Sequence, residues 1–259
     1  MMKTLIVLPT YNERHTLPAL VRKIFSMEGL DVHVLVVDDN SSDGTAEAAR
    51  ALALEDSRLS LIERPGKLGL GTAYLTGFAW GLERDFQCFV EMDSDLSHNA
   101  FGLPGFLAEI EKGADLVIGS RYLGGTISVV GWDFRRLLLS KFGNFYAATI
   151  LRLPLSDITS GYRAFSRQAL EHIPLESIHS EGYAFQIEMA YNVWQAGLSV
   201  KEIPITFTER RAGVSKMSKA IIREAVWLPW MLRLRGTAGL GLRLLAGRGA
   251  HFQPKDRRL

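Results

Sequence analysis

Short, largely apolar runs alternate in the first half of the chain with segments whose apolar residues recur at helical spacing. The apolar runs are residues 4–8, 32–37, 59–62, 86–92 and 115–119. The segments of helical periodicity are residues 13–25, 45–54, 72–82 and 101–111. Strands of a parallel sheet are apolar throughout because both of their faces are covered. The pattern therefore predicts an α/β fold with a mostly parallel sheet flanked by helices.

The pattern changes after Tyr122, where a glycine-rich stretch begins. We expect helices over residues 134–150, 185–195 and 220–234, and strands over residues 161–166 and 200–208. The chain shows no internal repeat and no low-complexity segment. We assign residues 1–217 to the main domain and residues 218–259 to an amphipathic helix with a basic tail.

Composition narrows the function. The chain has 259 residues, 47% of them hydrophobic and 22% charged, which is typical of a folded α/β protein. A net charge of +2 argues against a nucleic-acid partner. The single Cys88 excludes an internal disulfide and suits a reducing compartment. We find neither a signal peptide nor an apolar run of the ~20 residues that a transmembrane segment needs.

The basic residues gather at the C-terminal end. Residues 233–259 contain seven Arg or Lys and one acidic residue, Asp256. The preceding helix carries Trp227 and Trp230 beside Arg223 and Arg233, a composition suited to a membrane surface. A core helix followed by a solvated tail is the alternative.

Polar residues follow the predicted strands. Residues 10–13, 38–39, 93–95 and 120–121 come after the first, second, fourth and fifth strands. In open parallel sheets, ligands bind beyond the carboxyl ends of the strands. We therefore expect these clusters to converge on one binding site.

The pair Asp93 and Asp95 is the most informative of these clusters. An i, i+2 spacing in extended backbone places both carboxylates on the same side. Such hard oxygen ligands suit Mg²⁺ or Mn²⁺ bound to a diphosphate. The pair predicts an enzyme that uses a nucleotide-activated substrate, although Asp is also common in ordinary turns after strands.

Other candidates carry less specific signals. Asp38 and Asp39 would repel each other unless a ligand such as a ribose or a base donates hydrogen bonds to them, and helix capping is the alternative. Arg121 and Arg136 suit a phosphate acceptor, and Ser140 lies one helical turn after Arg136. The basic loop of residues 209–216 could close over a diphosphate or could be an ordinary charged loop.

Three other classes fit less well. Gly69-Leu70-Gly71 lacks the third glycine of a dinucleotide fingerprint and follows the third strand rather than the first, which argues against a Rossmann dehydrogenase. Residues 10–13 are not the glycine-rich, basic loop that a nucleotidyltransferase would need. The intact carboxylate and arginine pairs argue against a catalytically silent nucleotide-binding module.

Over residues 3–217, these motifs together resemble the dolichol- and polyprenol-phosphate mannose synthases of glycosyltransferase family two. The matching stretches are Pro9-Thr10-Tyr11-Asn12-Glu13, Val37-Asp38-Asp39-Asn40-Ser41-Ser42-Asp43-Gly44, Gly69-Leu70-Gly71-Thr72, Met92-Asp93-Ser94-Asp95-Leu96-Ser97-His98, Gly119-Ser120-Arg121-Tyr122, Ser160-Gly161-Tyr162-Arg163, Glu181-Gly182-Tyr183, Glu202-Ile203-Pro204 and Ser215-Lys216.

The resemblance implies a GT-A fold and inverting transfer of mannose from GDP-mannose to a polyprenyl phosphate, with Mg²⁺ or Mn²⁺. By motif position, the residues expected to bind the donor are Pro9, Tyr11, Glu13, Asp38, Asp39, Asp93, Ser94, Asp95, Arg210 and Lys216. Of these, Asp93 and Asp95 would hold the metal. The acceptor phosphate would be bound by Arg121, Arg136 and Ser140, and the catalytic residues would be Asp95, Arg121 and Arg136.

The chain departs from the family pattern in two places. Ser94 replaces an Ala that is common between the two aspartates, and Ser97 stands where some members have a metal-binding Gln. A glucosyltransferase that uses UDP-glucose and the same kind of acceptor is the alternative. We expect a cytoplasmic protein, peripheral on the cytoplasmic face of the membrane through its C-terminal interfacial helix.

Overall fold

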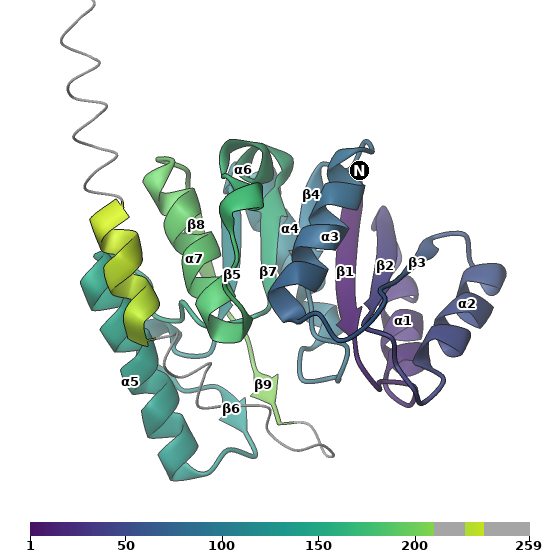
Figure 1. Cartoon of the computed structure of the whole chain (residues 1–259), viewed down its shortest axis with the longest axis horizontal. Helices are drawn as coiled ribbons and strands as arrows, with labels where there is room; N and C mark the ends of the chain where they lie inside the picture. Colours follow the sequence, from purple (N-terminus) through teal and green to yellow (C-terminus); the bar gives the residue numbers. More distant parts are fainter. Residues whose placement is uncertain (210–225, 236–259) are drawn as a thin grey trace, which may run out of the picture.

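The computed structural model describes residues 1–209 and 226–235. The largest element of this part is a seven-stranded sheet of order β3-β2-β1-β4-β7-β5-β8 (Figure 1). Its strands are β1 (Thr4–Thr10), β2 (Val32–Asp38), β3 (Leu59–Glu63), β4 (Cys88–Glu91), β5 (Leu116–Ser120), β7 (Arg163–Ser166) and β8 (Val200–Pro204). Neighbouring strands are parallel except where β7 pairs with β4 and β5. The predicted mostly parallel α/β sheet is confirmed.

Helices cover both faces of this sheet. One face carries α1 (Leu17–Phe25), α2 (Thr45–Glu55) and α4 (Leu103–Glu111), and the other carries α3 (Leu70–Leu82), α6 (Arg167–His172) and α7 (Gly182–Gln195). Strand residues alternate between the two layers. In β1, Ile6 and Leu8 pack in the first layer and Leu5 and Val7 in the second. Burial on both faces explains the continuous apolar strands.

A second group of elements adjoins the carboxyl edge of the sheet. The short strands β6 (Val129–Val130) and β9 (Phe207–Thr208) pair in parallel, and α5 (Phe134–Leu151) follows β6. The remaining elements are the 3₁₀ turns η1 (Ala100–Gly102), η2 (Leu123–Gly125) and η3 (Leu175–Ser177).

The helix of residues 226–235 lies beside α5 (yellow in Figure 1). Its inner residues Leu228 and Leu232 join the same buried cluster as Ala147 of α5. The Tyr146 hydroxyl of α5 donates to the Val226 carbonyl at 3.0 Å. Within residues 1–209 and 226–235, no helix has both the length and the apolarity needed to cross a bilayer.

Two predicted elements need correction. The first helix begins at Leu17 rather than at residue 13, because Asn12 adopts a left-handed φ of 61° and the Glu13 amide donates to the Thr45 hydroxyl at 2.9 Å. The single strand expected over residues 200–208 is wrong. It divides into β8, which pairs with β5, and β9, which pairs with β6. Both corrections come from contacts between segments distant in sequence.

Candidate functional site

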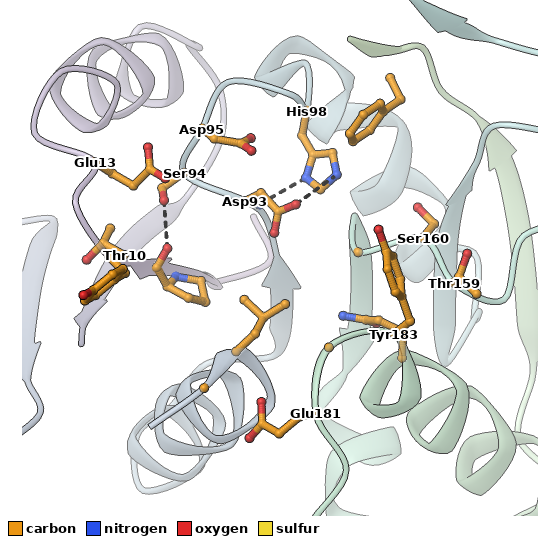
Figure 2. Close-up of a pocket in the computed structure, with 18 of the residues that line it drawn as sticks. Thr10, Glu13, Asp93, Ser94, Asp95, His98, Thr159, Ser160, Glu181 and Tyr183 are labelled. Carbon is orange, nitrogen blue, oxygen red and sulfur yellow. Dashed lines mark hydrogen bonds and ion pairs between the residues drawn. The ribbon is translucent and has the colours of Figure 1, made fainter. Parts of the chain in front are cut away.

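The polar clusters at the strand ends surround one pocket of about 460 Å³ at the carboxyl edge of the sheet. In Figure 2, Asp93, Asp95 and His98 lie on one side of this pocket, and Thr159, Ser160 and Tyr183 face them. The acidic side chains follow β4, whereas Arg121 follows β5 and Arg136 belongs to α5. The pocket therefore brings carboxylates and guanidinium groups together from separate elements.

The structure places most of the sequence-predicted site residues around this pocket. The lining includes Pro9, Tyr11, Glu13, Asp39, Asp93, Ser94, Asp95, Arg121 and Arg136. It does not include Asp38 or Ser140. Arg210 and Lys216 lie outside the described residues.

The carboxylates of Asp38 and Asp39 accept hydrogen bonds from other groups of the protein, so neither needs a ligand to supply donors. The Asp38 carboxylate accepts hydrogen bonds from the Thr10 hydroxyl (2.7 Å) and from the amide (2.8 Å) and hydroxyl (2.6 Å) of Ser41. The Asp39 carboxylate accepts from Arg64 Nε at 2.5 Å and from the Gly69 amide at 3.1 Å. Asp38 thus ties β1 to β2, and Asp39 fixes the loop that precedes α3.

The loop after β4 has several local anchors. The Ser94 hydroxyl donates to the Pro9 carbonyl at 2.8 Å, which joins this loop to the end of β1. The Ser97 amide donates to Asp95 Oδ1 at 3.0 Å, and Leu96 between them has a left-handed φ of 65°. The buried Ser97 hydroxyl has no hydrogen-bond partner among the described residues. The turn therefore presents several hard oxygen atoms within a few residues.

His98 also lines the pocket, although no role was predicted for it from the sequence. Its Nδ1 accepts a hydrogen bond from the Asp93 amide at 3.1 Å, which leaves the proton on Nε2. That nitrogen lies 3.8 Å from Asp93 Oδ2. Burial lowers the pKa of His98 below its ordinary value, although Asp93 and Asp95 oppose the shift. A neutral His98 therefore holds the Asp93 backbone amide through Nδ1 and places its Nε2–H near, but not in hydrogen-bond contact with, the Asp93 carboxylate.

The turn after β4 suits a cation that takes some of its ligands from the protein and the rest from a bound substrate. In the part of the chain that the structure describes, no group of three or more His, Cys, Asp or Glu side chains could hold a metal. Mg²⁺ is commonly bound by one or two carboxylates together with substrate phosphates and water. Asp93 and Asp95, with the unpartnered Ser97 hydroxyl nearby, fit this kind of site.

Arg121 is held in a fixed orientation by Asp157, a residue absent from the sequence argument. Asp157 accepts from Arg121 Nε at 2.7 Å, from Nη2 at 2.6 Å and from the Arg121 amide at 2.9 Å. Glu202 in turn accepts from the Asp157 amide at 2.9 Å. Burial alone would lower the pKa of Arg121, but its hydrogen bonds and charge attraction with Asp157 together raise the pKa above its ordinary value. Arg121 therefore remains charged.

Arg136 lies in the first turn of α5, where the Asp133 carboxylate caps its amide at 2.8 Å. Its guanidinium forms an ion pair with Glu209 and lies 4.4 Å from the centroid of the Trp132 ring. Ser140, one turn later, accepts a hydrogen bond from the Tyr122 hydroxyl at 2.9 Å. Ser140 thus supports Tyr122 and does not reach the pocket lining.

A buried polar pair lies beside the pocket in the sheet. Glu91 of β4 is opposite Arg163 of β7 in the strand register. Burial raises the pKa of Glu91 to about 7, against the attraction of Arg163, and lowers the pKa of Arg163 to about 10. Arg163 donates to the carbonyls of Ile158 (2.6 Å) and Ser160 (2.7 Å). It therefore fixes the loop that carries Asp157.

This sheet order, with an acidic pocket at its carboxyl edge, defines a GT-A-type glycosyltransferase. Comparisons with known proteins agree with that class. The family model described as Glycosyl transferase family 2 matches residues 5–174, and the chain belongs to this family.

Two relatives match most of the chain. The polyprenol monophosphomannose synthase of Mycolicibacterium smegmatis is 48% identical over 237 residues, which cover 90% of this chain and 88% of the relative. The undecaprenyl-phosphate mannosyltransferase of Micrococcus luteus is 44% identical over 225 residues, which cover 87% and 91%.

Solved structures share the fold. Glucosyl-3-phosphoglycerate synthase from Mycobacterium tuberculosis, crystallised with Mn²⁺, UDP-glucose and phosphoglyceric acid, aligns with a TM-score of 0.66 at 21% sequence identity. The alignment covers 90% of this chain and 80% of that protein. The same enzyme with Mg²⁺ and UDP has a TM-score of 0.65.

Proposed function

We propose that this enzyme transfers mannose from GDP-mannose to a polyprenyl phosphate, with inversion at the sugar carbon and with Mg²⁺ or Mn²⁺. The main support for this proposal is that Asp93, Asp95, Arg121 and Arg136 line the same pocket. A donor diphosphate needs a cation bound by carboxylates, and an acceptor phosphate needs fixed guanidinium groups. The names of the two mannosyltransferase relatives support the sugar and the lipid acceptor.

On the donor side, Asp93 and Asp95 would hold the cation, with His98 anchoring the backbone of Asp93 through a hydrogen bond to its amide. When bound, the cation would neutralise the charge that develops on the departing diphosphate. Pro9, Tyr11, Glu13 and Asp39 line the part of the pocket expected to hold the nucleotide. Arg210 and Lys216 would cover the donor phosphates.

On the acceptor side, a phosphate monoester carries about −1.5 to −2 charges near neutral pH. Its oxygen can therefore attack the sugar carbon without a general base, unlike a hydroxyl acceptor. Arg121 and Arg136 would hold that phosphate and orient its attack. A single displacement inverts the configuration at the attacked carbon.

The long apolar tail of such an acceptor stays in a lipid phase, and the outer surface of the protein suits that phase. In α5, the outward-facing Phe134, Phe142 and Phe145 are 71%, 64% and 70% exposed. The adjacent helix exposes Trp227, Trp230 and Leu234, whereas its Leu228 and Leu232 are buried.

This arrangement reverses the usual one, in which a surface helix turns its polar residues to water. We name these exposed apolar residues of the two adjacent helices, which are Phe134, Leu138, Phe142, Phe145, Trp227, Trp230 and Leu234, the apolar platform. Exposed Arg135, Lys141 and Arg235 accompany it, which suits anionic lipid headgroups. We therefore propose that the enzyme binds peripherally to a membrane, on the cytoplasmic face, where anionic lipids would attract these basic residues.

The test is direct. Purified protein is incubated with a short polyprenyl phosphate and either radiolabelled GDP-mannose or UDP-glucose, in Mg²⁺, Mn²⁺ or chelator. The proposal expects mannosyl transfer that requires the cation and gives the inverted product. Transfer of glucose alone would establish the UDP-glucose alternative, and full activity in chelator would refute the metal.

A further inference from the structure

The two arginines assigned to the acceptor phosphate are each paired with a carboxylate, but in different surroundings. The side chains of Arg121 and Asp157 are 5% and 0% exposed. Those of Arg136 and Glu209 are 35% and 36% exposed. An arginine that binds phosphate must offer N–H groups that no other acceptor occupies. Acceptor binding therefore depends on whether each carboxylate stays paired with its arginine or moves away from it.

The buried pair is not exchangeable. Asp157 accepts three hydrogen bonds from Arg121, and its own amide is fixed by Glu202. Pulling Arg121 away would leave a buried, uncompensated carboxylate, which is strongly unfavourable. The third nitrogen, Nη1, has no hydrogen-bond partner among the described residues, because Asp157 and Thr159 use only Nε and Nη2. Arg121 lines the pocket, so its Nη1 can donate to a phosphate bound there.

The second pair can open. Among the described residues, the Glu209 side chain has Arg136 as its only hydrogen-bond partner, and the Glu209 amide donates to the Val130 carbonyl at 2.9 Å. Its side chain can rotate into water, since about a third of it is already exposed. Arg136 would keep its position after Glu209 leaves, because Asp133 caps its amide and Trp132 contacts its guanidinium.

We propose that Asp157 is a positioning residue for Arg121, whereas Glu209 is a placeholder that occupies Arg136 until the acceptor phosphate displaces it. This inference rests on the proposed function. A phosphate monoester carries more charge than a carboxylate and binds guanidinium in the same two-pronged geometry, so it can replace Glu209. Asp157 instead preorganises Arg121 for every binding event.

The two roles predict opposite effects of the same chemical change. Asp157→Asn removes a charge that orients Arg121, so the acceptor KM should rise at least about tenfold. Glu209→Gln removes an internal competitor, so the acceptor KM should fall about two- to fivefold, the size expected for a part-exposed ion pair. The KM for GDP-mannose should stay unchanged in both variants.

The experiment measures steady-state kinetics with a short prenyl phosphate and saturating GDP-mannose. Glu63→Gln is the matched control, because Glu63 forms a similar exposed pair with Arg50, whose side chains are 46% and 50% exposed, outside the pocket lining. If Asp157→Asn does not fold, Glu202→Gln replaces it, since that change loosens Asp157 without leaving Arg121 unpaired.

Calorimetric binding of the same prenyl phosphate, without turnover, is a second readout. Acceptor constants that move in opposite directions, with Glu63→Gln unchanged, support the inference. Constants that move in the same direction, or a Glu209→Gln variant that binds acceptor more weakly, overturn it. A wild-type enzyme that transfers no mannose would instead refute the proposed function.

Discussion

Removing the aromatic side chains of the apolar platform tests how the enzyme meets its lipid substrate. The double variant Phe142→Ser, Phe145→Ser changes two residues that are 64% and 70% exposed. Complete burial of a Phe side chain contributes about 1.5–3 kcal/mol. Roughly two-thirds of each ring is available for burial, so the pair should contribute about 3 kcal/mol to membrane binding. That corresponds to about a hundredfold change in the partition coefficient.

The assay is flotation with neutral phosphatidylcholine vesicles at high salt, which screens the contribution of the basic residues. Both rings point outward, so the thermal midpoint of the variant should change little. Leu54→Ser is the matched control, because Leu54 is 91% exposed on α2 and lies outside the platform. Activity toward a water-soluble, short prenyl phosphate should be preserved.

The reasoning would be refuted by vesicle binding of the double variant equal to that of wild type. Loss of activity toward the soluble acceptor would also count against it, because the aromatic residues would then belong to the pocket rather than to a docking surface. Equal losses in the Leu54→Ser control would show a general effect of reduced surface hydrophobicity.

Three further changes test the donor side of the pocket. Asp95→Ala should lower kcat by about a hundredfold or more with circular dichroism unchanged, and near-normal turnover across a Mn²⁺ titration would exclude the metal role. Arg64→Gln breaks the buried pair with Asp39 and should lower the free energy of unfolding by about 3 kcal/mol and raise the GDP-mannose KM; denaturant titration and kinetics that match wild type would contradict this. Because the pKa of His98 is lowered in the folded protein, stability should fall as pH drops below about 6.5, by at most ~1.4 kcal/mol per pH unit for this group. His98→Asn should make that fall in thermal midpoint between pH 7.5 and 5.5 shallower but not abolish it, since His33 also has a lowered pKa; an identical slope would show that His98 contributes nothing.

Much of the fold follows from local pattern. The parallel strands could be predicted because burial on both faces makes them continuously apolar, as in Leu5 to Leu8 of β1. Helix ends were harder to predict, because the left-handed Asn12 and its neighbours depend on a second loop. The division between β8 and β9 depends on two different partner strands.

The candidate site was only partly predictable, for a related reason. Asp93 and Asp95 stand out because their spacing and their place after a strand are both local features. Asp157 carries no such signal, and its role is visible only from its hydrogen bonds to Arg121, 36 residues away in sequence. Asp38 and Ser140 were predicted to bind ligands from their positions in the sequence. In the structure, Asp38 accepts a hydrogen bond from the Thr10 hydroxyl, and Ser140 accepts one from the Tyr122 hydroxyl.

The residue types at the carboxyl ends of the strands could be predicted from local sequence, because hydrophobic periodicity and turn chemistry act over a few residues. The tertiary structure alone decided which charged groups neutralise one another, which remain available to a ligand, and that α5 turns aromatic rings outward. Those outcomes depend on burial and on distances between segments far apart in the chain, and neither quantity is written in local sequence.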